Sequence, residues 1–439
     1  MPPKIELLAP AGSYRKLEYA YAFGADAAYI GVPFFSLRAR ENEFNLEELE
    51  RAIQLARRLN KKIYVTANVF ARNRKISSFE QQMQEWVHLK PDALIMSDPG
   101  LMMMVREKFP EIPLHLSVQA NCMNWQGVKF WHKSLGVERV ILSRELHVNE
   151  IREIKQRVPE VELEAFVHGA ICIAYSGRCL MSSYFSYRDA NQGVCDNSCR
   201  EKFKVFEVDK KQDKDYYLED LRNKGEFYQI EEDENGTYLM NAKDLRLIDH
   251  LKEIIDAGVI SLKIEGRTKS EHYVALVCRS YRRALSDLEQ GKGFDPALYS
   301  ELDKIANRGY HSGFMVTETN QDSQNYDAST PRYFTQKFAG LILESTPETP
   351  EGYIPFEVRN KLMVGQECEI LEPQGGNHDF TVQAIMNAKM MDVPVAHGGT
   401  GLHYIKFDRK PEPFSILSVK TSHFHKEPPK VKDSPDLVL

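Results

Sequence analysis

The sequence lacks any apolar run long enough to serve as a signal peptide or to cross a membrane, and its N-terminus, Met1-Pro-Pro-Lys-Ile-Glu, is not apolar. We therefore expect a cytoplasmic protein with reduced thiols and no membrane partner. The sequence also has no large excess of one charge: its net charge is −6 over 439 residues. Because the net charge of the protein is negative, it would not attract the phosphates of a nucleic acid as a whole. A local basic patch would have to bind them.

Two common cofactor motifs are absent as well. No Gly-x-Gly-x-x-Gly turn follows the first predicted strand, so the usual sequence motif for dinucleotide binding is absent. No Cys-x-x-Cys knuckle occurs, and the gaps within the main cysteine group are six, fifteen and three residues. Structural zinc is therefore disfavoured without being excluded.

What the chain does contain is a concentration of thiols. Four of its seven cysteines fall between positions 172 and 199, namely Cys172, Cys179, Cys195 and Cys199. Thiolates are soft ligands, which favour zinc or an iron–sulfur cluster over a hard cation. The spacing favours the iron–sulfur cluster, with zinc and with unligated or catalytic thiols as alternatives.

The N-terminal three quarters of the chain repeat one unit, a short β-branched run that is followed by an amphipathic segment. At 42% hydrophobic residues the chain can bury a large core. Eight such runs predict a TIM-like (β/α)8 barrel over residues 1–330, with an open doubly wound sheet as the alternative. The runs are 5–9, 27–31, 62–67, 93–97, 114–118, 139–143, 161–168 and 260–265.

A long insertion over 168–258 separates the seventh run from the eighth, and it begins with the cysteines. Barrel enzymes place their active sites at the C-terminal ends of the strands, so we expect the metal above this mouth. The pattern then changes to short strands at 334–343, 353–358, 367–371, 380–386 and 401–407. They predict a small all-β domain over 331–425, followed by a disordered tail over 426–439.

Alternation along the predicted strands indicates a polar barrel lumen. A purely structural barrel fills its interior with aliphatic side chains, so these polar groups either form a satisfied hydrogen-bond network or hold a polar ligand. Gln119, His168 and Glu265, near strand ends, are the better functional candidates. The residues expected to point inward are Tyr64, Thr66, Asn68, His115, Ser117, Gln119, Glu162, Glu164, His168, Lys263 and Glu265.

The densest basic region follows the barrel, where a predicted helix around 271–290 carries Arg279, Arg282 and Arg283. This helix is either a solvated face or a patch that tracks phosphates. Arg38 and Arg40 follow the second strand on the same side, and the aromatic residues beside them could stack a base.

The segment Glu164-Ala-Phe-Val-His-Gly-Ala-Ile-Cys172-Ile-Ala-Tyr-Ser-Gly-Arg-Cys179 resembles the signature of the collagenase-like peptidases, a group first filed as proteases of unknown catalytic type. The resemblance covers nearly the whole chain. Six further motifs are similar to the branch of this family that modifies tRNA, at 7–12, 36–40, 93–100, 115–121, 141–146 and 261–269.

This resemblance implies prephenate-dependent, oxygen-independent hydroxylation of the tRNA wobble uridine to 5-hydroxyuridine. It implies a 4Fe–4S cluster on Cys172, Cys179, Cys195 and Cys199, although one relative takes its fourth ligand from further along the chain. The implied partners are tRNA, prephenate as co-substrate, the iron–sulfur assembly machinery and an electron-transfer partner. The candidate catalytic residues are His168, Glu265, Gln119 and Asn121, and the candidate cations for the prephenate carboxylates are Arg38, Arg40, Arg144, Lys263 and Arg267.

Related hydroxylases act on ribosomal RNA or on a quinone precursor, and these substrates are the first alternatives. A peptidase would need one activated thiolate with a base, such as Cys172 or Cys179 with His168. Four clustered thiols argue against it. A non-catalytic RNA-binding scaffold would leave the polar lumen unexplained.

Overall fold

The computed structural model describes residues 4–37, 44–172, 174–177, 179–182, 188–192, 194–195, 197–200, 203–210, 213–220, 227–230, 242–316 and 334–421. Three predictions lie outside these residues: the placement of Arg38 and Arg40, the domain boundary at 330/331, and the tail over 426–439.

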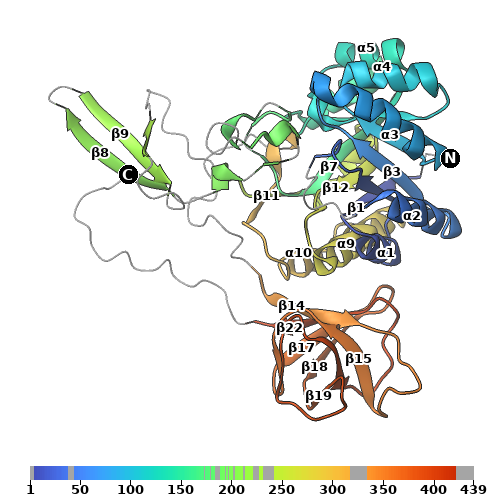
Figure 1. Ribbon diagram of the computed structural model, residues 1–439, viewed down its shortest axis with the longest axis vertical. Coiled ribbons are helices and arrows are strands. Elements are labelled where there is room, and N and C mark those ends of the chain that lie inside the picture. The colour runs from blue at the N-terminus through green and yellow to red at the C-terminus, as the bar shows by residue number, and fades with distance from the viewer. Residues whose placement is uncertain are drawn as a thin grey trace.

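Eight parallel strands in the described chain close into a barrel (Figure 1). Each strand pairs with the next, and the eighth pairs with both the seventh and the first. The strands are β1 (Glu6–Pro10), β2 (Ala27–Gly31), β3 (Lys62–Ala67), β4 (Ala93–Met96), β5 (Leu114–Leu116), β6 (Val137–Ile141), β7 (Glu162–Gly169) and β12 (Val259–Ile264). This closure confirms the predicted (β/α)8 barrel and excludes the open sheet.

Helices pack around the barrel, and local capping signals begin several of them. Asn45 and Glu48 form a capping box at the start of α2, and the Asp98 carboxylate accepts the first free amides of α4. No helix in the described ranges combines the length and the apolar composition of a membrane span. The helices are α1 (Tyr14–Ala22), α2 (Leu46–Arg58), α3 (Ile76–His88), α4 (Pro99–Lys108), α5 (Trp125–Leu135), α6 (Val148–Arg157), α8 (Leu251–Asp256), α9 (Glu271–Glu289) and α10 (Ala297–Leu302).

The insertion between β7 and β12 contains a small antiparallel sheet of β8 (Phe203–Lys210), β9 (Asp213–Asp220) and β10 (Phe227–Ile230). In Figure 1 this sheet stands away from the barrel. The chain then returns as β11 (Asp244–Arg246), which runs antiparallel to β7 and pairs with β13 (Tyr310–His311). The C-terminal end of β7 is therefore hydrogen-bonded to β11.

The C-terminal part is an antiparallel all-β domain with its own hydrophobic core, as predicted. The single strand expected at 380–386 is wrong, because two strands share this region. β18 pairs with β17 and ends at Thr381, and β19 begins at Ile385 and pairs with β21. The last strand was not predicted. The strands are β14 (Gln336–Ile342), β15 (Tyr353–Val358), β16 (Leu362–Met363), β17 (Glu367–Leu371), β18 (Asn377–Thr381), β19 (Ile385–Asn387), β20 (Val395–Ala396), β21 (Gly401–Lys406) and β22 (Ile416–Lys420).

Candidate functional site at the barrel mouth

Three cations meet at the C-terminal mouth of the barrel around two aromatic rings. The Lys263 ammonium lies 4.3 Å from the centre of the Tyr29 ring and 5.5 Å from that of Phe166. The Arg144 guanidinium lies 4.0 Å from the Phe166 ring, and that of Arg267 lies 5.7 Å from the Tyr29 ring. Ring faces attract cations, so Tyr29 and Phe166 hold the three positive charges close together. The structure thus gathers three of the five predicted anion-binding cations.

Each cation is fixed by a hydrogen bond to the barrel. Arg267 donates to the Thr66 hydroxyl at 3.0 Å, and Arg144 donates to the carbonyl of Ala170 at 3.2 Å. The Nε of Arg144 is buried and has no hydrogen-bond partner among the described residues. A buried donor of this kind costs free energy unless a ligand accepts from it. An anion that accepts from the Arg144 Nε would remove this cost.

Lys263 connects the mouth to a charged layer in the middle of the barrel. It donates to Glu164 at 2.7 Å, and Glu164 is fully buried. Burial lowers the pKa of Lys263, and the Glu164 charge opposes this shift. Glu164 therefore favours the charged form of Lys263, the form that can bind an anion.

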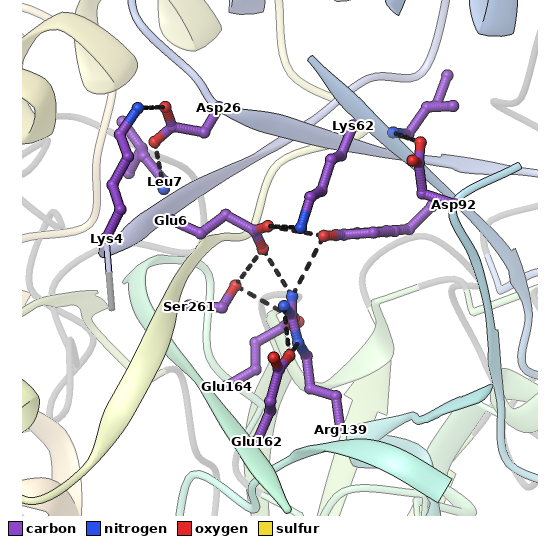
Figure 2. Close-up of polar contacts among 12 residues, drawn as sticks. Lys4, Glu6, Leu7, Asp26, Lys62, Asp92, Arg139, Glu162, Glu164 and Ser261 are labelled. Carbon is purple, nitrogen blue, oxygen red and sulfur yellow. Dashed lines mark hydrogen bonds and ion pairs between the residues drawn. The ribbon is translucent and has the colours of Figure 1, made fainter. Parts of the chain in front are cut away.

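The charged layer itself is organised by Arg139 (Figure 2). Its guanidinium contacts Glu6 at 2.6 Å, Glu162 at 2.7 Å and Glu164 at 3.3 Å. Tyr64 and Ser261 donate to Glu6, at 2.6 and 2.8 Å. Most polar groups of this layer are hydrogen-bonded to one another, so the middle of the barrel matches the predicted alternative of a structural hydrogen-bond network. The unpartnered donor, the Nε of Arg144, lies at the mouth.

Glu6, Arg139 and Ser261 were not singled out from the sequence. Glu6 is the single charge in β1, and Arg139 follows a glutamate in β6, so neither strand shows a polar alternation that marks an inward face. A rule that flags every charge inside a buried strand would have found both.

The predicted amides line the mouth between β3 and β6. Asn68 donates to the Ser117 hydroxyl at 3.1 Å, and the Asn121 carbonyl oxygen accepts from Ser143 at 2.8 Å. Gln119 is buried. Glu265 accepts from the Tyr29 hydroxyl at 3.2 Å, which places its carboxylate beside the cations. The structure leaves the catalytic roles of Gln119, Asn121 and Glu265 as predictions.

His168 does not point into the lumen as expected. Its ring packs against Tyr273, Tyr281 and Tyr310, with centroids 5.9, 5.4 and 5.5 Å away. The cause is a register shift, in which Lys263 pairs with Phe166 but Ile264 pairs with His168. The skipped residue reverses the alternation and turns His168 outward. Burial lowers the pKa of His168 to about 3, so the imidazole is neutral near pH 7. Its catalytic role remains a prediction.

The segment that carries the cysteines lies over the mouth. Gly177, at a φ of +77°, sits so close to Gln119 that an added Cβ would lie 2.2 Å from the Gln119 carbonyl oxygen. Further along, Asp189 pairs with Arg72 at 3.3 Å, and Gln192 donates to the carbonyl of Phe70. The insertion is therefore docked against loops that follow β3 and β5.

Four thiols are the donor set that a 4Fe–4S cluster takes, so the chemistry of the residues fits this group. Their geometry does not show it, because no group of three or more His, Cys, Asp or Glu residues within the described chain could hold a metal ion. Cys172 and Cys195 are exposed, and Cys179 and Cys199 are half-buried. The cluster remains a prediction from the sequence.

Comparisons with known proteins cover nearly all of this chain. The model of peptidase family U32 matches residues 12–325, and that of the peptidase family U32 C-terminal domain matches 335–418. A tRNA hydroxylation protein P of Escherichia coli is 46% identical over 421 residues, which are 90% of this chain and 92% of that protein. The protein of the same name from Haemophilus influenzae is 44% identical, covering 90% and 91%. A collagenase of Porphyromonas gingivalis is 30% identical, covering 84% and 87%.

Proposed function

The chain belongs to peptidase family U32, and we propose that it is a tRNA hydroxylase that converts the wobble uridine to 5-hydroxyuridine without dioxygen, with prephenate as co-substrate. The relatives that share most of its sequence carry the name tRNA hydroxylation protein, which supports the RNA substrate. Ribosomal RNA and a quinone precursor remain the alternative substrates.

The observation that carries the proposal is the cluster of Arg144, Lys263 and Arg267 at the barrel mouth. Prephenate has two carboxylates, and paired guanidinium and ammonium groups are the donors that bind them most strongly. Tyr29 and Phe166 supply flat apolar surfaces against which a ring can pack. Glu265, beside Tyr29, can accept a proton at the mouth.

We further propose that Cys172, Cys179, Cys195 and Cys199 hold a 4Fe–4S cluster above this mouth. Such a cluster transfers electrons one at a time, which zinc cannot do. Adding oxygen to a pyrimidine carbon without dioxygen requires that electrons be removed, and this need favours the cluster over zinc.

The peptidase alternative is weakened by the position of His168. This imidazole is 1% exposed and packs among tyrosines on the outer side of β7, so it is not available as a base for an exposed thiol such as Cys172.

The test is mass spectrometry of tRNA nucleosides from a strain without this protein, grown anaerobically and complemented with wild type or with variants. We expect 5-hydroxyuridine derivatives to disappear in the deletion strain and to return with wild type but not with Cys172→Ala. Cys368→Ala, at a buried position in the C-terminal domain, is the matched control. A strain that makes no prephenate should lose the same nucleosides.

Unchanged tRNA nucleosides in the deletion strain would contradict the proposal and direct attention to ribosomal RNA or to a quinone precursor. The cluster has its own readout, which is iron and acid-labile sulfide per chain after anaerobic purification. Wild type and Cys368→Ala should contain both, and Cys172→Ala should lose most of them. Zinc without sulfide in wild type would disprove the cluster.

A further inference from the structure

Two neighbouring loops at the mouth, after β2 and after β3, expose an aromatic ring beside a group of cations. We call Phe34, Arg72, Arg74 and Lys75 the Phe34 surface. Phe34 is 68% exposed, although most large apolar side chains of the barrel are buried. A single exposed apolar residue is common on protein surfaces, so its exposure alone shows nothing. Its backbone and its neighbours carry the argument.

Phe34 occupies a strained backbone position. The amide of Phe35 donates to the carbonyl of Pro33 at 2.8 Å, which closes a three-residue turn around Phe34. The φ of Phe34 is +64°, a value that bulky residues rarely adopt. Strain of this kind persists only where the surrounding structure enforces it, and it gathers at functional sites.

The surrounding structure enforces this conformation from both sides. Phe35 is buried against Phe79 and Trp86, with ring centroids 5.2 and 5.8 Å away. Lys75 donates to the carbonyl of Phe34 at 2.9 Å. The turn thus buries one phenylalanine and presents the other to solvent in a fixed place. A preorganised ring loses little entropy when it stacks on a ligand.

The cations of the surface come from one short run, Arg72-Asn-Arg74-Lys75, with no acidic residue between positions 71 and 79. Arg72 is 64% exposed and has one carboxylate partner among the described residues, Asp189. Arg74 is exposed and makes no hydrogen bond or ion pair with any residue that the structure describes. The loop therefore has a net positive charge that its own neighbours do not cancel.

The surface adjoins the candidate site. Arg267, one of the three mouth cations, donates to the carbonyl of Leu37 at 2.5 Å, three residues beyond Phe34. On the other side, Gln192 of the cysteine-bearing insertion donates to the carbonyl of Phe70. The Phe34 surface therefore lies beside the mouth that a reacting base would enter.

We propose that the Phe34 surface binds the RNA strand next to the target uridine, with Phe34 stacking on a neighbouring base and Arg72, Arg74 and Lys75 contacting its phosphates. This inference rests on the proposed function. Single-stranded RNA is recognised by this combination of a stacking ring and cations along the backbone.

The test is fluorescence anisotropy with an anticodon stem-loop RNA that has uridine at the wobble position. Phe34→Ala should weaken binding about 10-fold, because a stacked base contributes about 1–3 kcal/mol, and Phe34→Tyr should keep the wild-type affinity. Arg74→Ala should lower the slope of log affinity against log salt by about 0.7, the value for one phosphate of a single strand. Circular dichroism of each variant checks that the fold is kept.

The matched controls are Phe130→Ala, another exposed phenylalanine on α5, and Arg58→Ala, an exposed arginine at the end of α2, at the opposite end of the barrel. Both should bind as wild type does. Wild-type affinity in Phe34→Ala and an unchanged salt slope in Arg74→Ala would overturn the Phe34 surface while leaving the hydroxylase proposal intact. A wild-type protein that neither binds this RNA nor alters tRNA nucleosides in cells would overturn both.

Discussion

Arg139 is the residue on which the charge balance of the barrel interior depends. Its side chain is 4% exposed and contacts Glu6 and Glu164, which are 10% and 0% exposed. Lys263 pairs with Glu164 at 2.7 Å and the exposed Lys62 with Glu6 at 3.9 Å, so of these three cations only Arg139 contacts both carboxylates. A buried ion pair adds little net stability when it forms, but removing one partner leaves the other charge uncompensated.

We therefore expect Arg139→Met to lower the free energy of unfolding by about 3–5 kcal/mol. Urea unfolding at neutral pH measures this change. Arg157→Met is the control, because Arg157 pairs with Glu153 on the surface, where the two side chains are 60% and 55% exposed. That pair is worth about 0.3–0.5 kcal/mol. Equal effects of the two substitutions would show that the interior does not depend on Arg139.

At the scale of elements, α9 differs most from the expectation. Arg279 and Arg282 are 18% and 23% exposed and bonded within the protein, so they form neither a solvated face nor a patch for phosphates, whereas Arg283 is 56% exposed. Arg279 donates to Asn377 of the C-terminal domain at 2.5 Å, Arg282 donates to the carbonyl of Gly24 at 2.8 Å, and Arg283 pairs with Asp295 at 2.6 Å. Most of the helix is buried between the barrel and the C-terminal domain, so the charges of Arg279 and Arg282 serve packing.

The first turn of α9 also contains a buried histidine. His272 stacks on Phe338 of β14, with ring centroids 5.6 Å apart, and its Nε2 has no hydrogen-bond partner among the described residues. Burial, together with the charges of Lys304 and Arg279, lowers the pKa of His272 to about 4.

This depressed pKa predicts a pH dependence of stability. Between about pH 6.5 and 4 the unfolded chain binds a proton at His272 that the folded protein does not, so folding stability falls as the pH falls through this range, by about 1.4 kcal/mol per pH unit for this residue. We expect His272→Phe to remove that part of the slope. Urea unfolding at several pH values in this window measures it, with the exposed His397→Phe as control. A slope equal to that of wild type would refute the assignment.

At the scale of the whole molecule, polar contacts attach the C-terminal domain to the barrel. Lys304, just after α10, pairs with Glu301 at 2.8 Å and with Glu369 of β17 at 2.8 Å. The Lys304 and Glu369 side chains are 11% and 6% exposed. Tyr19 of α1 meets Phe414 edge-on, 5.6 Å between centroids. The two domains thus share a largely buried interface.

Removing the cation from this interface should uncouple the domains. We expect Lys304→Ala to lower the free energy of unfolding by about 3 kcal/mol, because the Glu369 carboxylate stays buried without its partner. Differential scanning calorimetry should then show the C-terminal domain melting before the barrel. Lys292→Ala is the control, because Lys292 is 60% exposed where it pairs with Asp287 at 3.5 Å. A single wild-type transition in Lys304→Ala would contradict this role of the interface.

The sequence by itself determined the elements of the barrel. Strand and helix signals depend on the spacing of apolar residues and on caps such as Asn45, which are local, so each barrel strand was placed within about two residues. It also indicated the polar lumen and Lys263, because alternation fixes which face a strand residue occupies. Arg144 and Arg267 follow β6 and β12, and they were named because the resemblance implies a dicarboxylate that needs cations.

Only the tertiary structure decided which side chains meet. Arg139 finds Glu6 across the barrel, 133 positions away in the sequence. One skipped residue in the pairing of β7 with β12 turns His168 away from the lumen, and no local pattern announces it. The sequence did not show that Arg279 and Arg282 are half-buried, because their partners Asn377 and Gly24 lie far away along the chain. Periodicity is a property of neighbouring residues, whereas a buried contact depends on the closure of the whole barrel.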